Sequence, residues 1–358
     1  MKMLSKGEVE QITSCALCAD MCKHGCPVYL ATGSETLTPQ KIARLILYRE
    51  KGFIQDEPGF FKVMFGDAMC GACKVNCIYG NFDLREFIHK ERGEAFKRNM
   101  LPQETGRRVE NFARFGNPDG ERQLIQRGKG EAGYLVSCSA YRDAAILGAV
   151  EKVLAASGEC QEFGGADICC GAPLYYAGDA EGFKRAAEMM KGEIEQRRLK
   201  KVITSCPACI KMMTELYPRV GVRLDVELIH LTSFIAALLK QGKIKVNRVK
   251  ATATFHDPCL LVNDMGITAA PREVIEVLGL EIKEPVYRGK YAHCCGGLPG
   301  GKIGDGKLSG RVNAMRAGEL KETGAEVYLS ACPTCKAALA AVGMKDIAEL
   351  VAERISYG

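Results

Sequence analysis

The chain has 358 residues, of which 47% are hydrophobic and 26% charged, a composition typical of a folded globular protein with two or three domains. Its N-terminus lacks the apolar segment of a secretion signal, and no run of about 18 apolar residues predicts a membrane span. The formal net charge of +6 counts all 18 cysteine thiols as neutral. We therefore expect a cytoplasmic protein whose cysteines bind metal rather than form disulfides.

The N-terminal part combines predicted helices with two groups of cysteines. Helical periodicity covers residues 40–49 and 82–97. We expect a first domain of residues 1–105 with its cysteines in loops between helices. The seven cysteines of this part are Cys15, Cys18, Cys22, Cys26, Cys70, Cys73 and Cys77.

A polar segment separates this part from the rest of the chain. The turn-forming residues 116–120 and the polar run to Gly130 predict a loop, and we assign residues 106–130 to a linker. Basic residues of the segment 107–129 are interleaved with acidic ones and accompanied by few aromatic residues. This mixture favours a solvated face or a partner-docking surface over a nucleic-acid site.

The remaining sequence contains one cysteine pattern twice. The first five-cysteine set is Cys138, Cys169, Cys170, Cys206 and Cys209, and the second is Cys259, Cys294, Cys295, Cys332 and Cys335. Corresponding cysteines lie 121 to 126 residues apart, each adjacent pair is followed by glycine, and each final couple reads C-P-x-C. A period of this length indicates two domains rather than a solenoid, and we place them at residues 131–247 and 248–358.

Each copy alternates β-rich runs with helical stretches, which predicts α/β domains with parallel sheets. The β-rich runs at 134–136, 202–204, 252–256 and 327–329 end just before cysteines, and helical stretches follow at 142–156 and 271–278. The cysteines are therefore expected at the carboxyl ends of strands, where such sheets bind ligands. Cys160, the one cysteine outside the pattern, fits a buried apolar strand position.

The spacings narrow the choice of metal. Zinc explains an isolated C-x-x-C couple, but adjacent cysteines bind one tetrahedral ion with difficulty because the peptide between them restricts their reach. A polynuclear iron–sulfur cluster offers a different iron to each neighbour, and thiolate sets without histidine suit either metal. A catalytic dithiol at Cys206/Cys209 and Cys332/Cys335 is a third interpretation. The recurrence of a distant cysteine with an adjacent pair favours iron–sulfur clusters.

This repeated pattern resembles a known family, the cysteine-rich CCG domain proteins, which include the D-type subunit of heterodisulfide reductase and the glycolate oxidase iron–sulfur subunit. The intervals between a cysteine, Cys-Cys-Gly and C-x-x-C are 30 and 35 residues in the first copy and 34 and 36 in the second. The segments His256–Cys259 and His293–Gly297 are especially similar to the family's second copy. The resemblance implies a noncubane 4Fe–4S cluster on each five-cysteine set, whose cysteines are catalytic ligands if disulfide reduction occurs.

The N-terminal part resembles the ferredoxin module that precedes these domains in single-chain relatives. That module has C-x2-C-x2-C-x3-C-P twice, and the fourth cysteine of each run serves the other cluster. Here the Cys18–Cys22 gap has one extra residue, Asp67 stands at a cysteine position and Ile78 at a proline position. The resemblance implies one cluster on Cys15, Cys18, Cys22 and Cys77, and another on Cys26, Cys70 and Cys73 with Asp67 or solvent. Whether there are one or two clusters, one of them 3Fe–4S, stays open, as does the alternative that Asp67 only lines the rim.

Other motifs have structural as well as functional interpretations. His256 and His293 adjoin predicted ligands and are candidates to donate hydrogen bonds to sulfur or to pass protons, although holding the loop is an equal alternative. The glycine-rich residues 296–302 lack P-loop spacing, so close backbone approach to a cluster explains them better. There is no G-x-G-x-x-G fingerprint, and we expect no flavin or NAD on this chain.

These features predict an α+β and α/β multidomain protein: a helical ferredoxin-like module followed by two CCG domains. The leading functional interpretation is an electron-transfer subunit of a redox complex with flavoprotein, ferredoxin-like or membrane cytochrome partners. A disulfide reductase acting between two noncubane clusters is the first alternative, and a zinc-stabilised interaction module is an alternative of another class. We expect no nucleic-acid partner and contact with a membrane only through a partner subunit. Three or four clusters, each of net charge about −2 with its thiolates, would cancel the formal +6.

Overall fold

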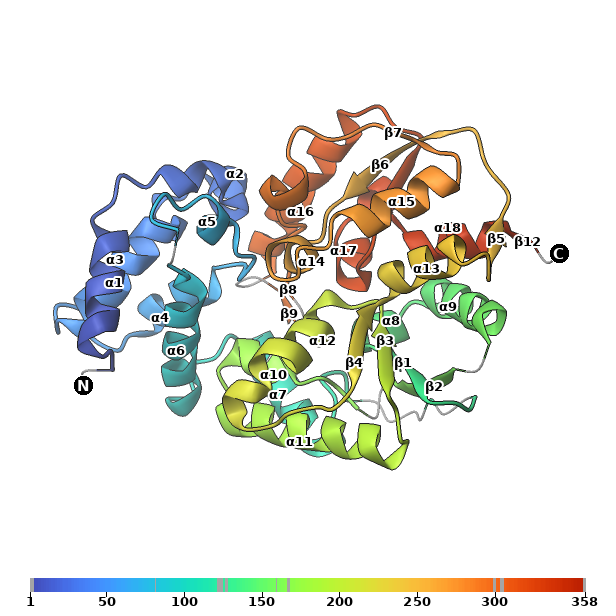
Figure 1. The fold of residues 1–358 in the computed structure, drawn as a ribbon. Coiled ribbons are helices and arrows are strands. Elements are labelled where there is room, and N and C mark those ends of the chain that lie inside the picture. Colours follow the sequence, from blue (N-terminus) through green and yellow to red (C-terminus); the bar gives the residue numbers. More distant parts are fainter. Residues whose placement is uncertain are drawn as a thin grey trace.

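The N-terminal part consists of helices and connecting loops, with no strand among its described residues, and forms one side of the molecule (Figure 1). The computed structural model describes residues 3–80, 82–120, 125, 128–158, 160–165, 168–298, 301–302 and 306–356. Its first helices are α1 (Lys6–Ala16), α2 (Pro27–Thr32), α3 (Pro39–Glu50), α4 (Pro58–Phe65), α5 (Ala72–Val75) and α6 (Leu84–Lys97). None of the described helices is long and apolar enough to cross a membrane.

Capping residues in the sequence mark the first residues of two of these helices. Ser5 caps α1 in a reciprocal arrangement with Glu8, and Thr38 caps α3, whose first residue is Pro39. The prediction that all N-terminal cysteines lie in loops is wrong for three of them. Cys15 lies in the last turn of α1, Cys22 in a 3-10 helix (Met21–Gly25) and Cys73 in α5.

The predicted linker begins with regular structure. Helix α7 (Gln103–Phe115) covers its first residues and packs on α10 (Ala172–Ala177). One face of α7 is apolar, so burial against α10 stabilises a helix that extends into the predicted linker. Residues 121–124, 126 and 127 of that segment lie outside the described residues, and the domain boundaries stay a prediction.

The first repeat is a four-stranded parallel sheet in the order β2-β1-β3-β4. Its elements are β1 (Ala132–Val136), α8 (Cys138–Tyr141), α9 (Ala144–Ser157), β2 (Gln161–Gly164), α10, α11 (Ala180–Gln196), β3 (Lys201–Thr204), α12 (Pro207–Lys211), β4 (Glu227–His230) and α13 (Leu231–Lys240). Cys160 precedes β2 and is partly exposed, so the prediction of a buried strand position is wrong. Pairing of β2 with β1 begins at Gln161, one residue later.

The second repeat has the equivalent strand order β11-β10-β6-β7, again parallel. Its elements are β6 (Thr252–His256), α14 (Cys259–Asn263), α15 (Ala269–Val277), β7 (Glu281–Ile282), the hairpin β8 (Gly297–Leu298) and β9 (Gly301–Lys302), α16 (Lys307–Lys321), β10 (Val327–Ser330), α17 (Pro333–Ala338), β11 (Lys345–Asp346) and α18 (Ile347–Arg354). The predicted parallel α/β repeats are thus confirmed. Pro299 and Gly300 of the glycine-rich segment lie outside the described residues.

The two repeats exchange their last helices. Helix α18 of the second repeat packs on α9 of the first, and α13 of the first packs on α15 of the second. A short antiparallel pair, β5 (Lys245–Val246) with β12 (Ile355–Ser356), joins the ends of the two repeats. Apolar residues of both sheets and of all four helices form one buried cluster, so the repeats share a core.

Candidate metal centres

The short helices that follow the cysteine-bearing strands meet between the two sheets (Figure 1). Helix α8 contacts α17, and α12 contacts α14, so each contact joins one repeat to the other. Because parallel strands end at the same edge, this geometry brings both five-cysteine sets to the middle of the molecule. Of the ten thiol residues, all but Cys138 and Cys259 are buried.

The first five-cysteine set forms a chain of interacting sulfurs. Cys138 interacts with Cys169, Cys169 with Cys170, and Cys170 with Cys209, which also interacts with Cys206. Hydrogen bonds from Cys169 and Cys209 lower the pKa of Cys170 to about 6 against the opposing effect of burial. Glycine is required directly after the adjacent pair, because Gly171 has φ +77° and an added Cβ would lie 2.9 Å from Ala186.

The second five-cysteine set repeats this arrangement. The sulfurs of Cys259 and Cys294 lie 3.9 Å apart, and Cys295 interacts with Cys294 and Cys335. Gly296 has φ +81°, and a Cβ there would come within 2.8 Å of Asn313 in α16. The glycine is therefore required by the close approach of this loop to a helix.

A small cavity lies between the two sets. It has a volume of about 20 Å³ and is lined by residues of both sets, including Cys206, Cys259, Cys295, Cys332 and Cys335. Ala68 and Met69 of the N-terminal part close one side. Residues of both sets therefore line one common space.

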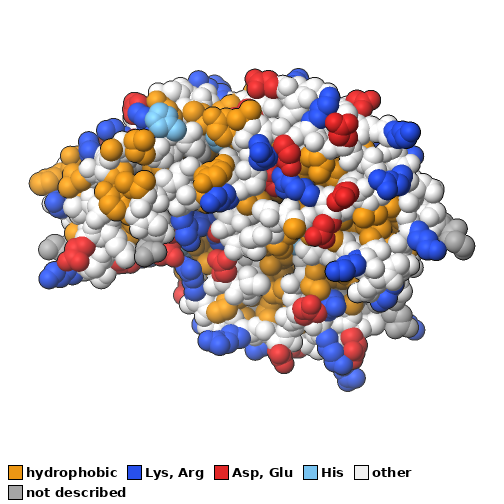
Figure 2. Space-filling model, turned by 45° about the horizontal axis from the view of Figure 1, so that its top comes forward, with side chains coloured by type: hydrophobic (Ala, Val, Ile, Leu, Met, Phe, Trp, Pro, Cys, Tyr) orange, Lys and Arg blue, Asp and Glu red, His pale blue; other side chains and the backbone are white. Residues whose placement is uncertain are grey.

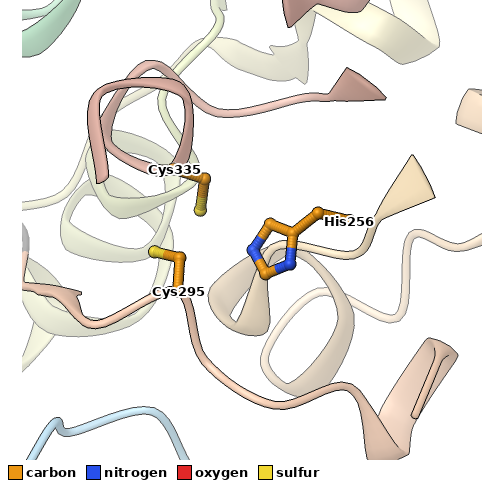
Figure 3. Close-up of side chains that lie close together, drawn as sticks. All are labelled: His256, Cys295 and Cys335. Atoms are coloured by element: carbon orange, nitrogen blue, oxygen red, sulfur yellow. The ribbon is translucent and has the colours of Figure 1, made fainter. Parts of the chain in front are cut away.

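One histidine, His256, lies beside the thiols of the second five-cysteine set. A ring nitrogen of His256 and the sulfurs of Cys295 and Cys335 lie within 4.8 Å of one another, and the ring points its outer nitrogen towards the sulfurs (Figure 3). Burial lowers the pKa of His256, so the ring is neutral at neutral pH. These three residues alone could also hold a single metal ion, so a zinc site is an alternative here.

The seven N-terminal cysteines and Asp67 separate into two groups. In the first N-terminal group, Cys15 interacts with Cys18, Cys22 and Cys77. In the second, Asp67 and Cys70 both act on Cys26 and on Cys73. The two groups have the same members as the crossed arrangement that the ferredoxin resemblance implies. Their roles as cluster ligands stay a prediction.

Asp67 also forms a hydrogen bond with the backbone of its own loop. Its Oδ1 accepts a 2.6 Å hydrogen bond from the backbone N–H of Met69, which adopts φ +53°. Burial raises the pKa of Asp67, although Arg92 and Arg85 oppose that effect. One carboxylate oxygen thus holds the turn that carries Cys70, and the other is available to the second N-terminal group.

The second N-terminal group touches the second five-cysteine set. The thiol of Cys70 interacts with Cys294, and its carbonyl accepts a 3.0 Å hydrogen bond from Asn263. Asp264, the next residue, binds Arg85 of α6 at 2.9 Å and Lys211 of the first repeat at 2.8 Å. This buried junction fastens all three parts of the chain beside their thiols.

The chemistry of the thiols fits iron–sulfur clusters. Burial, together with Asp20 and Cys18, raises the pKa of Cys22 to about 12, and burial also raises the pKa of Cys15 and Cys26. Such thiols stay protonated unless a cation stabilises the thiolate. Three or more thiols in each group, with adjacent cysteines in two of the groups, match a polynuclear iron core better than isolated hard cations.

Sequence patterns missed two groups of residues around these centres. Arg316 and Glu319, which connect His256 to His293, lie on α16 with no motif around them. Asp264, Lys211 and Arg85 are likewise distant in sequence. An i,i+3 spacing of Arg316 and Glu319 was the available signal, but it is common on exposed helices and does not indicate burial.

Comparisons with known proteins agree with the cysteine pattern. The cysteine-rich domain family CCG matches residues 132–214 and 253–340. The D subunit of dihydromethanophenazine:CoB–CoM heterodisulfide reductase from Methanosarcina barkeri is 28% identical, across 99% of this chain and 96% of that protein.

Two further relatives share part of the chain. The B subunit of fumarate reductase (CoM/CoB) from Methanothermobacter marburgensis is 26% identical, across 67% of this chain and 47% of that protein. The probable iron–sulfur-binding oxidoreductase FadF from Bacillus subtilis is 28% identical, across 48% of this chain and 26% of that protein. The chain therefore contains two regions that match the cysteine-rich CCG domain, and it is similar along nearly its whole length to heterodisulfide reductase D subunits.

Proposed function

We propose that this protein is the electron-transfer subunit of a multi-subunit redox complex, with an N-terminal site where electrons enter and an internal site where they are used. The observation that carries the proposal is the contact of Cys70 with Cys294, which links the N-terminal groups to the paired five-cysteine sets. Clusters bound by these thiolates would supply one-electron carriage. We assign 4Fe–4S clusters to the N-terminal groups, one of them with Asp67 as a ligand, and noncubane clusters to the five-cysteine sets.

The first N-terminal group is the one nearest to solvent. Its four cysteines are all partly exposed, and a pocket of about 50 Å³ opens beside them. Large hydrophobic side chains surround it: Leu17 is 72% exposed, Met21 60%, Ile78 77% and Tyr79 59%. Figure 2 shows hydrophobic side chains gathered over the N-terminal part of the molecule. Exposed apolar surface of this kind is typical of a docking site, and it supports electron exchange with a partner subunit here.

The interior offers a stepwise route between the groups. Cys73 interacts with Cys22 of the first N-terminal group and with Asp67 and Cys70 of the second. Cys70 in turn meets Cys294, and the central cavity joins the second five-cysteine set to the first. A side-chain interaction links the two N-terminal groups, and another links the second of them to the second five-cysteine set. The two five-cysteine sets line one cavity, so each step of the route is short enough to suit electron transfer.

A second candidate function is reduction of a disulfide between the two five-cysteine sets. The observation that favours it is the cavity lined by Cys206 of one set and Cys259, Cys295, Cys332 and Cys335 of the other. Reduction of a disulfide RSSR′ takes up two electrons and two protons, breaks the S–S bond and releases two thiols. In this scheme the reductant is a partner redox protein that delivers electrons one at a time, and the protons come from solvent.

The first experiment tests the cluster assignment. Anaerobically purified protein should contain about 12–16 iron atoms, and as many acid-labile sulfides, per chain, corresponding to three or four four-iron clusters. Stoichiometric zinc with negligible sulfide would instead support the interaction-module alternative and overturn the proposal.

The second experiment separates the two redox functions. Reduced viologen is supplied with a heterodisulfide of coenzyme type, and the release of thiols is measured. Rapid turnover by the isolated chain supports the reductase, whereas cluster reduction without thiol release supports the relay. Identification of a co-purifying flavoprotein or cytochrome subunit then names the natural partner.

A further inference from the structure

The two five-cysteine sets have matching cysteines but different surroundings. His256, His293 and Arg316 precede Cys259, Cys294 and Cys332 by 3, 1 and 16 positions. At the same distances before Cys138, Cys169 and Cys206, the first repeat has Leu135, Ile168 and Met190. All six side chains are buried. A hydrogen-bonded polar network in one repeat thus replaces apolar side chains in the other.

The network of the second repeat runs from the sulfurs outward along α16. Arg316 donates from Nε to Nδ1 of His256 at 3.1 Å and from Nη1 to Glu319 at 2.7 Å. The other carboxylate oxygen of Glu319 lies 2.6 Å from Nδ1 of His293. Burial raises the pKa of Glu319, but the hydrogen bonds from His293 and Arg316 outweigh it and leave the pKa below its usual value.

This network fixes the orientation and the tautomer of His256. A guanidinium group can only donate hydrogen bonds, so Nδ1 of His256 accepts and the ring proton resides on Nε2. Nε2 is buried, and the ring of His256 interacts with the thiol of Cys295. It is the nitrogen directed at the sulfurs of Cys295 and Cys335 (Figure 3). The second set therefore has an N–H donor, that of His256, directed at two of its sulfurs.

The corresponding place in the first repeat has no such donor among the residues that the structure describes. Leu135, Ile168 and Met190 belong to the apolar cluster that contains Cys169 and Cys170. The charges nearest to this set are compensated, because Lys211 pairs with Asp264 and Arg142, whose side chain is 47% exposed, pairs with Asp119. The hydroxyl of Tyr217 lies near Cys170 but donates its hydrogen bond to the Cys170 carbonyl. The first repeat thus has leucine at the position where the second has the N–H of His256.

We propose that the second five-cysteine set provides the site of higher reduction potential, and that His256, positioned by Arg316, makes it so. Reduction adds negative charge to a cluster, and a hydrogen bond to a ligand sulfur stabilises that charge. An apolar surrounding offers no such stabilisation, and the first set has the lower potential. The inference rests on the proposed binding of one cluster to each set.

Anaerobic redox titration followed by EPR spectroscopy tests the difference. His256→Leu places the first repeat's residue in the second repeat, and it should lower the potential of one of the two noncubane couples and leave the other unchanged. We expect the ratio of reduced to oxidised protein at fixed potential to change at least about tenfold, which is about 59 mV for one electron. Arg316→Met should shift the same couple in the same direction, because His256 loses its fixed tautomer.

Two further variants make the result specific. His256→Gln can still donate from its amide and should keep most of the native potential. His89→Gln changes a half-buried histidine that stacks on Tyr175, and it should move neither noncubane couple. Unchanged potentials in His256→Leu with full iron content would overturn the inference. Loss of iron from His256→Leu would overturn it too, because His256 would then be a metal ligand. Absence of sulfide from the wild-type protein, by contrast, would overturn the proposed function itself.

Discussion

Asp67 illustrates how one side chain can serve a turn and a metal group together. One of its oxygens accepts a hydrogen bond from the backbone of Met69, and the charge of the carboxylate acts on the thiols of Cys26 and Cys73. Carboxylate is a harder ligand than thiolate and binds iron of a sulfide cluster less firmly. The second N-terminal group is therefore expected to have one iron that exchanges more readily than the others.

Replacing Asp67 with alanine should convert that group to a three-iron form. Iron analysis is expected to show about one iron fewer per chain, and EPR spectroscopy of the oxidised protein should show a 3Fe–4S signal. Asp67→Cys, which supplies the missing thiolate, should retain all the iron. Asp20→Asn is the control, because Asp20 is a buried carboxylate beside the first N-terminal group. Unchanged iron in Asp67→Ala would assign Asp67 to the turn alone.

Cys160 is the thiol that lies apart from all four groups. It precedes β2, its thiol donates a hydrogen bond to the carbonyl of Gln161, and its side chain packs against the shared apolar core. Cys160→Ser should change neither the iron content nor the sulfide content, and the free energy of unfolding should fall by less than about 1 kcal/mol. Cys209→Ser is the comparison and should lose iron from the first five-cysteine set. Iron loss in Cys160→Ser would place this cysteine among the ligands.

Residue patterns predicted the cysteine groups because ligand spacing is local and chemically restricted. The partners of Arg316 and Asp264 could not be predicted in this way. Arg316 meets His256 across 60 positions, and Asp264 meets Arg85 across 179. Only the closing of the sheets and the docking of α6 create these contacts. Burial of a charged residue is a property of the whole fold, and composition within a short window does not encode it.

At the scale of elements, the strands were easier to predict than the pairing of helices. Each β-rich run ends at a cysteine, which located β1, β3, β6 and β10. The same pattern suggested two independent domains, whereas α13 and α18 each pack on a helix of the other repeat. An amphipathic helix has an apolar face to bury, but its sequence does not say which neighbour covers that face.

The helix exchange predicts a crossed pattern of destabilisation. Val351 of α18 is fully buried, and Val351→Asp should raise hydrogen exchange most in α9, a helix of the other repeat. Ile235 of α13 is also fully buried, and Ile235→Asp should raise exchange most in α15. Exchange measured by mass spectrometry distinguishes these patterns. Loosening confined to the mutated repeat in both variants would contradict the exchange.

At the scale of the molecule, a few buried charges hold the N-terminal part against both repeats. Asp264→Asn leaves Arg85 and Lys211 buried without their shared carboxylate. Removing one partner of a buried ion pair costs about 3–5 kcal/mol. We expect a lower midpoint of anaerobic thermal unfolding and faster hydrogen exchange in α6 and α12.

An exposed ion pair offers the matched control for that variant. Glu86 and Arg219 join α6 to the first repeat, and both side chains are 56% exposed. Glu86→Gln should cost no more than about 1 kcal/mol. Equal effects of Glu86→Gln and Asp264→Asn would mean that the buried junction has no special part in joining the N-terminal helices to the repeats.

The hydrophobic surface at the opposite end of the electron route makes a separate prediction. Ile78→Glu places a charge within the apolar surroundings of the first N-terminal group. Reduction by the partner protein should slow at least about tenfold, while reduction by dithionite, which needs no docking, should keep its rate. Phe53→Glu changes an equally exposed hydrophobic residue outside that pocket and should affect neither rate. Equal slowing by both variants would place the docking surface elsewhere.

The exchange of α13 and α18 also bears on how such a chain arises. A gene that encoded one repeat alone would produce a protein with an uncovered helix face, and two copies could cover each other by trading their terminal helices. Joining two such genes end to end turns that pair into a single chain without altering its contacts. Once joined, the two halves are free to diverge, and in this chain one half has His256 and Arg316 where the other has leucine and methionine. A symmetric ancestor thereby becomes an asymmetric descendant.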